Sequence, residues 1–265
     1  MFEDLTSFQL YMWISFFVFL LPFTIILTAK LAQYFRRWGE IKSSGLEYSN
    51  QMVEISFEQK FLSINSTIIR SPSSQNLKKI LLIPPFTVSA KRYLYLATAL
   101  ALNNYEVHLI ESRKNIKKIL KEKFDSRLFA SEIAKTISPH AVVASDVFFS
   151  MLLPGMQQST QIQYVFIRPI LRYKQPSLLS SLFLSIPWIS NLFLLPLKPG
   201  DDNKFSISNR VLCIFPKILL KGRLANKTYA NLDIQLIQSR FSFRDKETMI
   251  FSRILQFIGG FSSSL

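Results

Sequence analysis

The sequence is poor in the residues that most often bind metals. Cys213 is the single cysteine among 265 residues, which excludes an intramolecular disulfide and a cysteine cluster for zinc or iron–sulfur ligation. His108 and His140 are the only histidines, too few for a multi-histidine metal site. The glycine-rich patterns Gly-x-Gly-x-x-Gly and Gly-x-x-x-x-Gly-Lys-Ser/Thr, which cradle phosphates, are also missing. We therefore expect neither a resident metal ion nor a cofactor.

The first 29 residues contain no lysine or arginine, and their only charged residues are Glu3 and Asp4. Residues 5–29 are uncharged and almost wholly apolar from 10 to 27, and about 20 such residues suffice to cross the hydrocarbon core of a bilayer. A proline within such a helix kinks it without excluding it. We therefore predict a transmembrane anchor over residues 1–38. The residues expected inside the membrane are Trp13, Phe16, Phe19 and Pro22.

Two other structures would account for this apolar stretch, a cleaved signal peptide and a buried core helix. A signal peptide starts with basic residues and ends at a small-x-small cleavage site, and neither feature is present here. Every lysine and arginine lies after residue 29, which by the positive-inside rule keeps the C-terminal side in the cytoplasm or an equivalent inner compartment. We therefore predict a single-pass membrane protein whose first partner is the lipid bilayer.

Residues 30–265 carry all 32 cations but only 15 of the 17 anions, a net charge of +17. A cationic domain held at a bilayer is attracted to anionic lipid headgroups, and the expected contacts are Lys30, Arg36 and Arg37, which follow the apolar stretch directly. Nucleic acid is the rival polyanion. No zinc-finger, RNP-like or helix-turn-helix pattern occurs, however, and the basic residues are scattered, so no nucleic-acid partner is expected.

Beyond a polar linker at 39–51, the chain alternates between strand patterns and helix patterns. Alternating or unbroken apolar runs predict the strands, and apolar residues at helical spacing predict the helices between them. The predicted strands are 52–59, 61–70, 79–83, 106–110, 141–144 and 162–167, and the predicted helices are 92–103, 126–136 and 147–153. A strand, a helix and a second strand within about 30 residues form a βαβ unit. The sequence thus predicts an α/β core with a mainly parallel sheet over 52–174.

Residues 52–170 resemble the N-terminal half of the α/β-hydrolase fold, and within it the polyester synthase and lipase-like branch. The resemblance rests on the two leading strands and on residues 80–86 (ILLIPPF), where family members have a strand that ends in an oxyanion-loop motif. It continues over 94–110, where they have a helix, a glycine turn and a strand that ends in an acidic residue. Here the turn is Asn103-Asn104 and the acid is Glu111.

The resemblance makes Ser145 and Asp146 the candidate catalytic residues, because they follow the strand at 141–144. The nucleophile of this family lies in a Gly-x-Ser-x-Gly turn, but both glycines are missing here, and bulky Val147 and Phe148 replace small residues. Asp146 is either a carboxylate nucleophile or the N-cap of the next helix. No catalytic residue is therefore assigned firmly.

The general base is the second missing part of a hydrolase. In this family the base is a histidine that follows the nucleophile in the chain, whereas His108 and His140 both precede Ser145. His108 lies inside a predicted strand and is expected to pack in the core. His140 is expected in a surface loop, at the opposite edge of the sheet from Ser145, and Cys213 lies in an apolar run typical of the core. The pattern indicates a pseudoenzyme.

A second uncharged stretch, residues 175–197, is long enough to be another membrane span. Pro187 divides it and basic residues flank both ends. Three structures are open: a lid or membrane-dipping cap, a second span, and ordinary core helices. We predict an apolar cap at 175–198 with Trp188 in the membrane, and we assign 199–265 to the C-terminal part of the α/β domain.

The leading functional hypothesis is a membrane-anchored, catalytically inactive hydrolase-like protein that acts as a binding or assembly subunit for other membrane proteins, since function depends on the site and not on the fold. The rival is a lipid or acyl-ester hydrolase or acyltransferase that uses Ser145 or Asp146. A third hypothesis is a membrane-associated glycosyltransferase. It rests on the pair Asp201-Asp202, which could form a metal–phosphate site of glycosyltransferase type, although the sequence Pro-Gly-Asp-Asp first of all predicts a turn.

Overall fold

The computed structural model describes residues 2–42, 45–57, 60–72, 77–86, 88–122, 125, 128–145, 148, 151–152, 156, 161–167, 210–216, 232–237 and 247–259. The chain divides into two compact units, Met1–Gly45 and Leu46–Leu265. The described part of the first unit is a long helix, and the second unit contains an eight-stranded sheet with its helices.

Helix α1 spans Phe2–Lys42, and part of it has the length and composition of a membrane-spanning helix. The segment Thr6–Ala29 has 24 residues and a mean hydropathy of 2.3, and none of it is buried inside the structure. Large apolar side chains, among them Trp13 and Phe16, are therefore exposed, as a lipid-facing surface requires. A signal sequence near an N-terminus has the same features.

The hydroxyl groups near the end of this apolar segment bond within the helix itself. Thr24 Oγ1 donates to the Leu21 carbonyl at 2.8 Å, and Thr28 Oγ1 donates to the Thr24 carbonyl at 2.9 Å. Pro22 lies inside the helix without ending it. These contacts suit a lipid environment, because a hydroxyl without a partner is costly in hydrocarbon.

Strand β1 begins earlier than its apolar pattern indicates. Helix α1 continues to Lys42 and β1 begins at Glu47, so the interval between them is shorter than the linker predicted at 39–51. The first five residues of β1, EYSNQ, are polar, yet they pair with β2 from Glu47 opposite Arg70 onward. Arg70 Nε also donates to Glu47 Oε2 at 3.0 Å. Backbone pairing extends this edge strand where hydrophobic alternation gives no signal.

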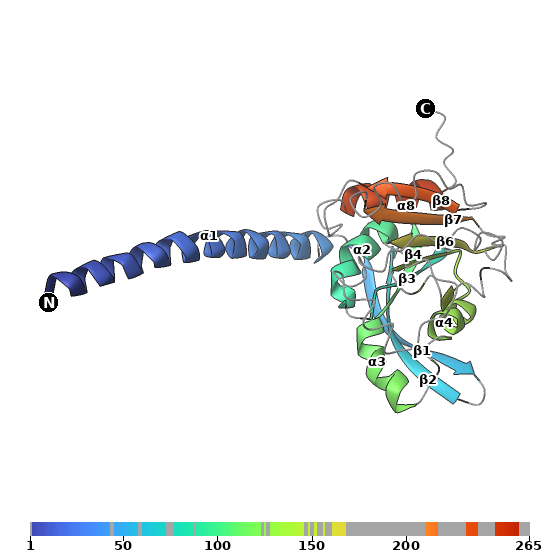
Figure 1. Cartoon of the computed structure of the whole chain (residues 1–265). Coiled ribbons are helices and arrows are strands. Elements are labelled where there is room, and N and C mark those ends of the chain that lie inside the picture. The colour runs from blue at the N-terminus through green and yellow to red at the C-terminus, as the bar shows by residue number, and fades with distance from the viewer. Residues whose placement is uncertain are drawn as a thin grey trace, which may run out of the picture. The chain divides into compact units, whose positions relative to one another are not determined.

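The second unit is a mixed sheet with the strand order β1-β2-β4-β3-β5-β6-β7-β8 (Figure 1). Strand β2 runs antiparallel to β1 and β4, and the other neighbouring strands are parallel. The strands are β1 (Glu47–Phe57), β2 (Lys60–Arg70), β3 (Lys78–Ile83), β4 (Tyr105–Ile110), β5 (Ala141–Ser145), β6 (Gln163–Ile167), β7 (Val211–Pro216) and β8 (Leu232–Ile237). The helices are η1 (Ala90–Tyr93), α2 (Leu94–Leu102), α3 (Ser112–Lys121), α4 (Phe129–Ile137) and α8 (Glu247–Ile258).

Helices cover both faces of the sheet, which is why its central strands are unbroken apolar runs. Successive residues of a strand point to opposite faces. On one face, here called the α2 face, helices α2 and α8 pack against Leu82 and Val143. On the other, the α4 face, helix α4 packs against Leu81 and Val142. The unit therefore has two core layers, one on each side of the sheet.

The predicted strands at 79–83, 106–110, 141–144 and 162–167 are confirmed as β3, β4, β5 and β6. The predicted helix at 92–103 is a 3₁₀ turn, η1, followed by α2. The turn Asn103-Asn104 is confirmed between α2 and β4, and Asn104 has a φ of 63°, a left-handed conformation that asparagine tolerates better than most residues. Cys213 is fully buried in β7, as predicted.

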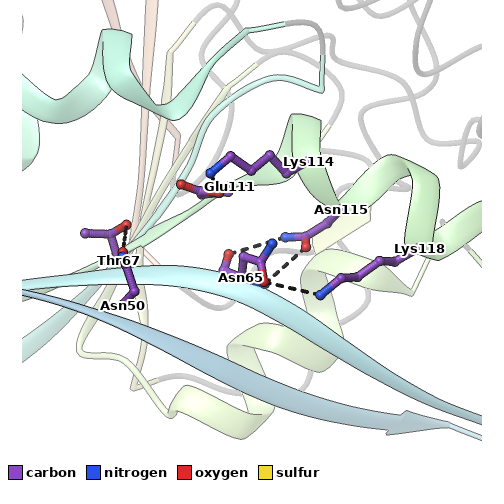
Figure 2. A network of polar contacts seen from close by, with 7 residues as sticks. All are labelled: Asn50, Asn65, Thr67, Glu111, Lys114, Asn115 and Lys118. Atoms are coloured by element: carbon purple, nitrogen blue, oxygen red, sulfur yellow. Dashed lines mark hydrogen bonds and ion pairs between the residues drawn. The ribbon is translucent and has the colours of Figure 1, made fainter.

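Helix α3 completes the edge of β2 where β4 ends. The ladder between β2 and β4 reaches the pair Ser66 and Ile110, and the neighbouring Asn65 lies beside α3 instead. Asn115 Oδ1 accepts a hydrogen bond from the Asn65 N–H at 3.1 Å, and Asn115 Nδ2 donates to the Asn65 carbonyl at 3.3 Å (Figure 2). The buried amide of Asn115 thus replaces a peptide group of a neighbouring strand.

Lys118 extends this connection between α3 and β2 by one more step along the strand. Its Nζ donates to the Ser63 carbonyl at 2.9 Å and to Asn65 Oδ1 at 3.2 Å. Across the hairpin, Thr67 Oγ1 donates to Asn50 Oδ1 at 3.1 Å, so side chains join β1 to β2 as well (Figure 2). Polar side chains thus connect β2 to α3 where β4 has ended, and they add to the backbone ladder between β1 and β2.

Candidate functional site

Ser145 is the last residue of β5 and lies at the carboxyl edge of the parallel strands, where open α/β sheets bind their ligands. The residue is only 3% exposed, and its Oγ lies 3.0 Å from the hydroxyl oxygen of Tyr93, at hydrogen-bond distance. Tyr93 belongs to η1, which follows β3, and its ring packs against the core of the α2 face. The serine hydroxyl is thus buried and bonded to a tyrosine.

The side chain of Ser145 lies on the α2 face of the sheet. Ala141 and Val143 belong to the buried cluster of that face, and Val142 and Ala144 belong to the cluster of the α4 face. Because side chains alternate along a strand, Ser145 shares its face with Val143, two residues earlier. Its contact with Tyr93 agrees with this placement.

His108 lies on the opposite face from Ser145. Its register partner on β3 is Leu81, which is in turn paired with Val142, and both partners belong to the α4 face. His108 is 6% exposed, and its Nε2 lies 2.7 Å from Glu106 Oε1. Burial lowers the pKa of His108, although the hydrogen bond with Glu106 acts in the opposite direction. The predicted core position is confirmed, and the sheet separates this imidazole from Ser145.

His140 directly precedes β5, so a strand of five residues, roughly 16 Å at about 3.3 Å per residue, separates it from the end where Ser145 lies. The residue lies in the loop before the strand, as predicted, and is half-buried there. Its N–H donates to the Lys79 carbonyl at 2.9 Å, which ties this short connection to the start of β3. Burial lowers the pKa of His140, and the charge of Lys78 lowers it further.

The loop after β3 is filled by aromatic packing. Phe86 is fully buried, with its ring centroid 5.0 Å from that of Phe148 and 5.6 Å from that of Phe129. The loop begins with Pro84 and Pro85, and the Pro85 carbonyl accepts a hydrogen bond from the N–H of Val88 at 3.0 Å. Three aromatic rings therefore occupy the volume beside the end of β3.

Glu111, the acid predicted at the end of β4, directly precedes helix α3. Its carboxylate forms an ion pair with Lys114 (Figure 2). Its carbonyl accepts hydrogen bonds from the N–H groups of Lys114 at 2.9 Å and Asn115 at 3.1 Å, and its own N–H donates to the Asn65 carbonyl at 3.1 Å. Each of these contacts holds α3 in place and none involves Ser145.

No family model and no curated protein matches the chain. Solved structures do match: a protein from Mycobacterium tuberculosis has a TM-score of 0.55 at 12% identity and covers 81% of this chain and 100% of its own length. A dienelactone hydrolase from Klebsiella pneumoniae also matches, with a TM-score of 0.50 at 10% identity over 81% of this chain and 100% of that one. Another, from Anabaena variabilis, has a TM-score of 0.50 at 11% identity over 80% of this chain and 98% of that one. This chain has a distant α/β-hydrolase-like fold. At such identities the likeness shows the fold alone.

Ser145 and the loop after β3 differ in geometry from the corresponding parts of an α/β hydrolase. In that fold the nucleophile lies on a strained turn between strand and helix. Ser145 instead pairs with Ile167 in the ladder between β5 and β6, and its φ is not positive. An oxyanion hole also draws an N–H group from the loop after the third strand. Pro84 and Pro85 open that loop here, and proline has no backbone N–H.

Other predicted site residues of this hydrolase-like chain lie outside the described residues. Asp146, Trp188 and the segment 175–198 belong to this group, so their predicted roles stay predictions. Four more of the predicted residues belong to helix α1, but the structure describes only their backbone: Phe19, Lys30, Arg36 and Arg37. Within the ranges given above, no three His, Cys, Asp or Glu side chains gather as a metal site requires.

Proposed function

We propose that this protein is a membrane-anchored, catalytically inactive α/β-hydrolase-like protein that acts as a binding or assembly subunit at the membrane. The observation that carries the proposal is the environment of Ser145. Its hydroxyl is buried and bonded to Tyr93, while the chain's two histidines lie on the other face of the sheet and at the other end of β5. Among the described residues, neither histidine lies within reach of this serine, and a serine without a base is not an activated nucleophile.

The anchor is the second part of the proposal. The exposed apolar segment Thr6–Ala29 supports insertion into a bilayer, and the cations that begin with Lys30 support retention of the sheet-bearing unit on the inner, cytoplasmic side. The net charge of +17 over residues 30–265 favours contact with anionic headgroups. Other membrane proteins are the expected partners. A folded domain without a nucleophile and its base can still function by binding other proteins through its surface.

The rival function is ester hydrolysis or acyl transfer through Ser145 or Asp146. The position of Ser145 at the carboxyl edge favours this rival, because that edge carries the active sites of α/β sheets. The rival needs a base other than histidine beside the serine, and the group that lies there is the Tyr93 hydroxyl. A phenol with a usual pKa of about 10 is a poor base at neutral pH.

An esterase assay separates the two functions. We expect purified full-length protein in detergent to hydrolyse p-nitrophenyl acetate and butyrate no faster than buffer does, and no faster than its Ser145→Ala variant. A Tyr93→Phe variant frees the serine hydroxyl without supplying a base, so it should stay inactive as well. Hydrolysis by the wild type that disappears in Ser145→Ala would establish the rival and overturn the proposal.

A further inference from the structure

The amino edge of the sheet is the place where the chain enters the second unit. Strand β1 is antiparallel to β2, which is antiparallel to β4, so β1 starts at the same edge as the parallel strands. The register confirms this, because Glu47 is opposite Arg70, Val107 is opposite Ile69, and Lys78 is opposite Tyr105. The covalent connection to α1 therefore reaches the sheet at its amino edge.

Exposed cations without carboxylate partners lie at this edge. Lys78 and Lys79 begin β3, and Arg210 directly precedes β7; all three are exposed. Among the residues that the structure describes, none of the three is ion-paired, and the guanidinium of Arg210 lies 4.8 Å from the ring centroid of Phe257. The resulting positive charge is available to an anionic surface.

Two acids whose side chains the structure describes lie at the same edge, and only one of them is paired with a cation. Glu47 pairs with Arg70 at 3.0 Å. Glu106, the register partner of Lys79, lies 2.7 Å from His108, whose pKa is lowered by burial. Lys78, Lys79 and Arg210 outnumber this one carboxylate, so the described residues of the edge keep a net positive charge toward an anionic surface.

An exposed apolar side chain lies at the same edge, at the end of helix α2. Leu102 ends helix α2 three residues before Tyr105, the register partner of Lys78, and it is 55% exposed. Tyr105 is half-buried at the start of β4. Cations next to an exposed leucine and a tyrosine are the combination that binds the interfacial region of a bilayer, where headgroups meet acyl chains.

We propose that the amino edge of the sheet, formed by Leu102, Lys78, Lys79 and Arg210, binds the anionic headgroups of the membrane that anchors α1. This inference rests on the proposed anchor. It adds a contact surface on the folded unit to the headgroup contacts expected along α1.

The test measures amide hydrogen exchange of the full chain in nanodiscs of neutral phosphatidylcholine and in nanodiscs that also contain phosphatidylserine. We expect exchange at the exposed turn Asn103-Asn104, beside Leu102, to slow by about threefold or more when the anionic lipid is present. The variant Lys78→Glu/Lys79→Glu should lose this protection. The matched control Lys91→Glu/Arg92→Glu changes exposed cations at the carboxyl edge by the same charge and should keep it.

Three outcomes would overturn the inference, and they differ from one another. If the chain is incorporated into both kinds of nanodisc but exchange at 103–104 does not depend on phosphatidylserine, the anchor stands and the amino edge does not bind headgroups. If the chain is not incorporated at all, the anchor itself is wrong, and the inference that rests on it falls with it. Equal loss of protection in both charge-reversal variants would also contradict a site at the amino edge.

Discussion

Two arginines in the middle of α1 should release the protein from membranes. The substitutions Phe17→Arg and Leu21→Arg fall at the centre of the segment Thr6–Ala29, where both native side chains are about half exposed, at 55% and 51%. Each arginine at the centre of a membrane helix costs about 2.5–3.5 kcal/mol of insertion free energy, so the pair should weaken insertion by about 5–7 kcal/mol. Alkaline carbonate extraction of membranes measures the effect: the wild type should remain in the pellet and the variant should appear in the supernatant.

The matched control keeps the segment apolar with Phe17→Leu and Leu21→Ile, and this variant should stay in the pellet. Extraction of the wild type by carbonate would show that α1 does not span the membrane. If the protein recovered from cells is shorter and lacks the apolar segment, that segment is a cleaved signal sequence and not an anchor.

Phe86→Ala should destabilise the sheet-bearing unit more than most single substitutions. Phe86 is fully buried and its ring meets those of Phe129 and Phe148, so truncation leaves a cavity that these rings fill only partly. A buried Phe→Ala change costs about 3–5 kcal/mol of the free energy of unfolding. Urea titration of the full chain in detergent, followed by near-UV circular dichroism, measures the loss.

The control for this prediction is Phe61→Ala. Phe61 lies in the same unit but is 71% exposed, so its removal should change the free energy of unfolding by about 0.5 kcal/mol or less. Equal effects of the two substitutions would show that the aromatic cluster after β3 is not part of the core. The prediction also tests the fold around Ser145, because Phe86 lies in the loop where a working hydrolase exposes backbone N–H groups.

The central strands could be predicted from the sequence because they are buried on both faces. Residues 79–83 and 141–144 are unbroken apolar runs, and both form strands of the parallel part of the sheet. The same reasoning placed Cys213 in the core and His108 inside a strand, as the structure confirms. The order of the histidines along the chain also indicated from the sequence alone that neither His108 nor His140 lies beside Ser145.

Features that depend on backbone pairing or on distant side chains could not be predicted. The first five residues of β1 are polar, and only their ladder with β2 makes them a strand. Asn115 is a polar residue in a basic helix, and nothing in its neighbourhood along the chain indicates that its amide pairs with Asn65, 50 residues away. The partner of Ser145 could not be predicted either. Tyr93 fits the apolar spacing of a core helix, and its hydroxyl contact with Ser145 joins residues 52 positions apart.

Covalent labelling of Ser145 tests the central claim most directly, because it measures the reactivity of the nucleophile without a choice of substrate. Full-length protein in its membrane is treated with a fluorophosphonate probe, which modifies activated serines, and the peptide that contains Ser145 is examined by mass spectrometry. Since the hydroxyl is buried and bonded to Tyr93 and has no histidine beside it, we expect the peptide to keep its unmodified mass. Stoichiometric modification at Ser145 in the folded protein, absent from the Ser145→Ala variant, would show that this hydrolase-like fold is an enzyme after all.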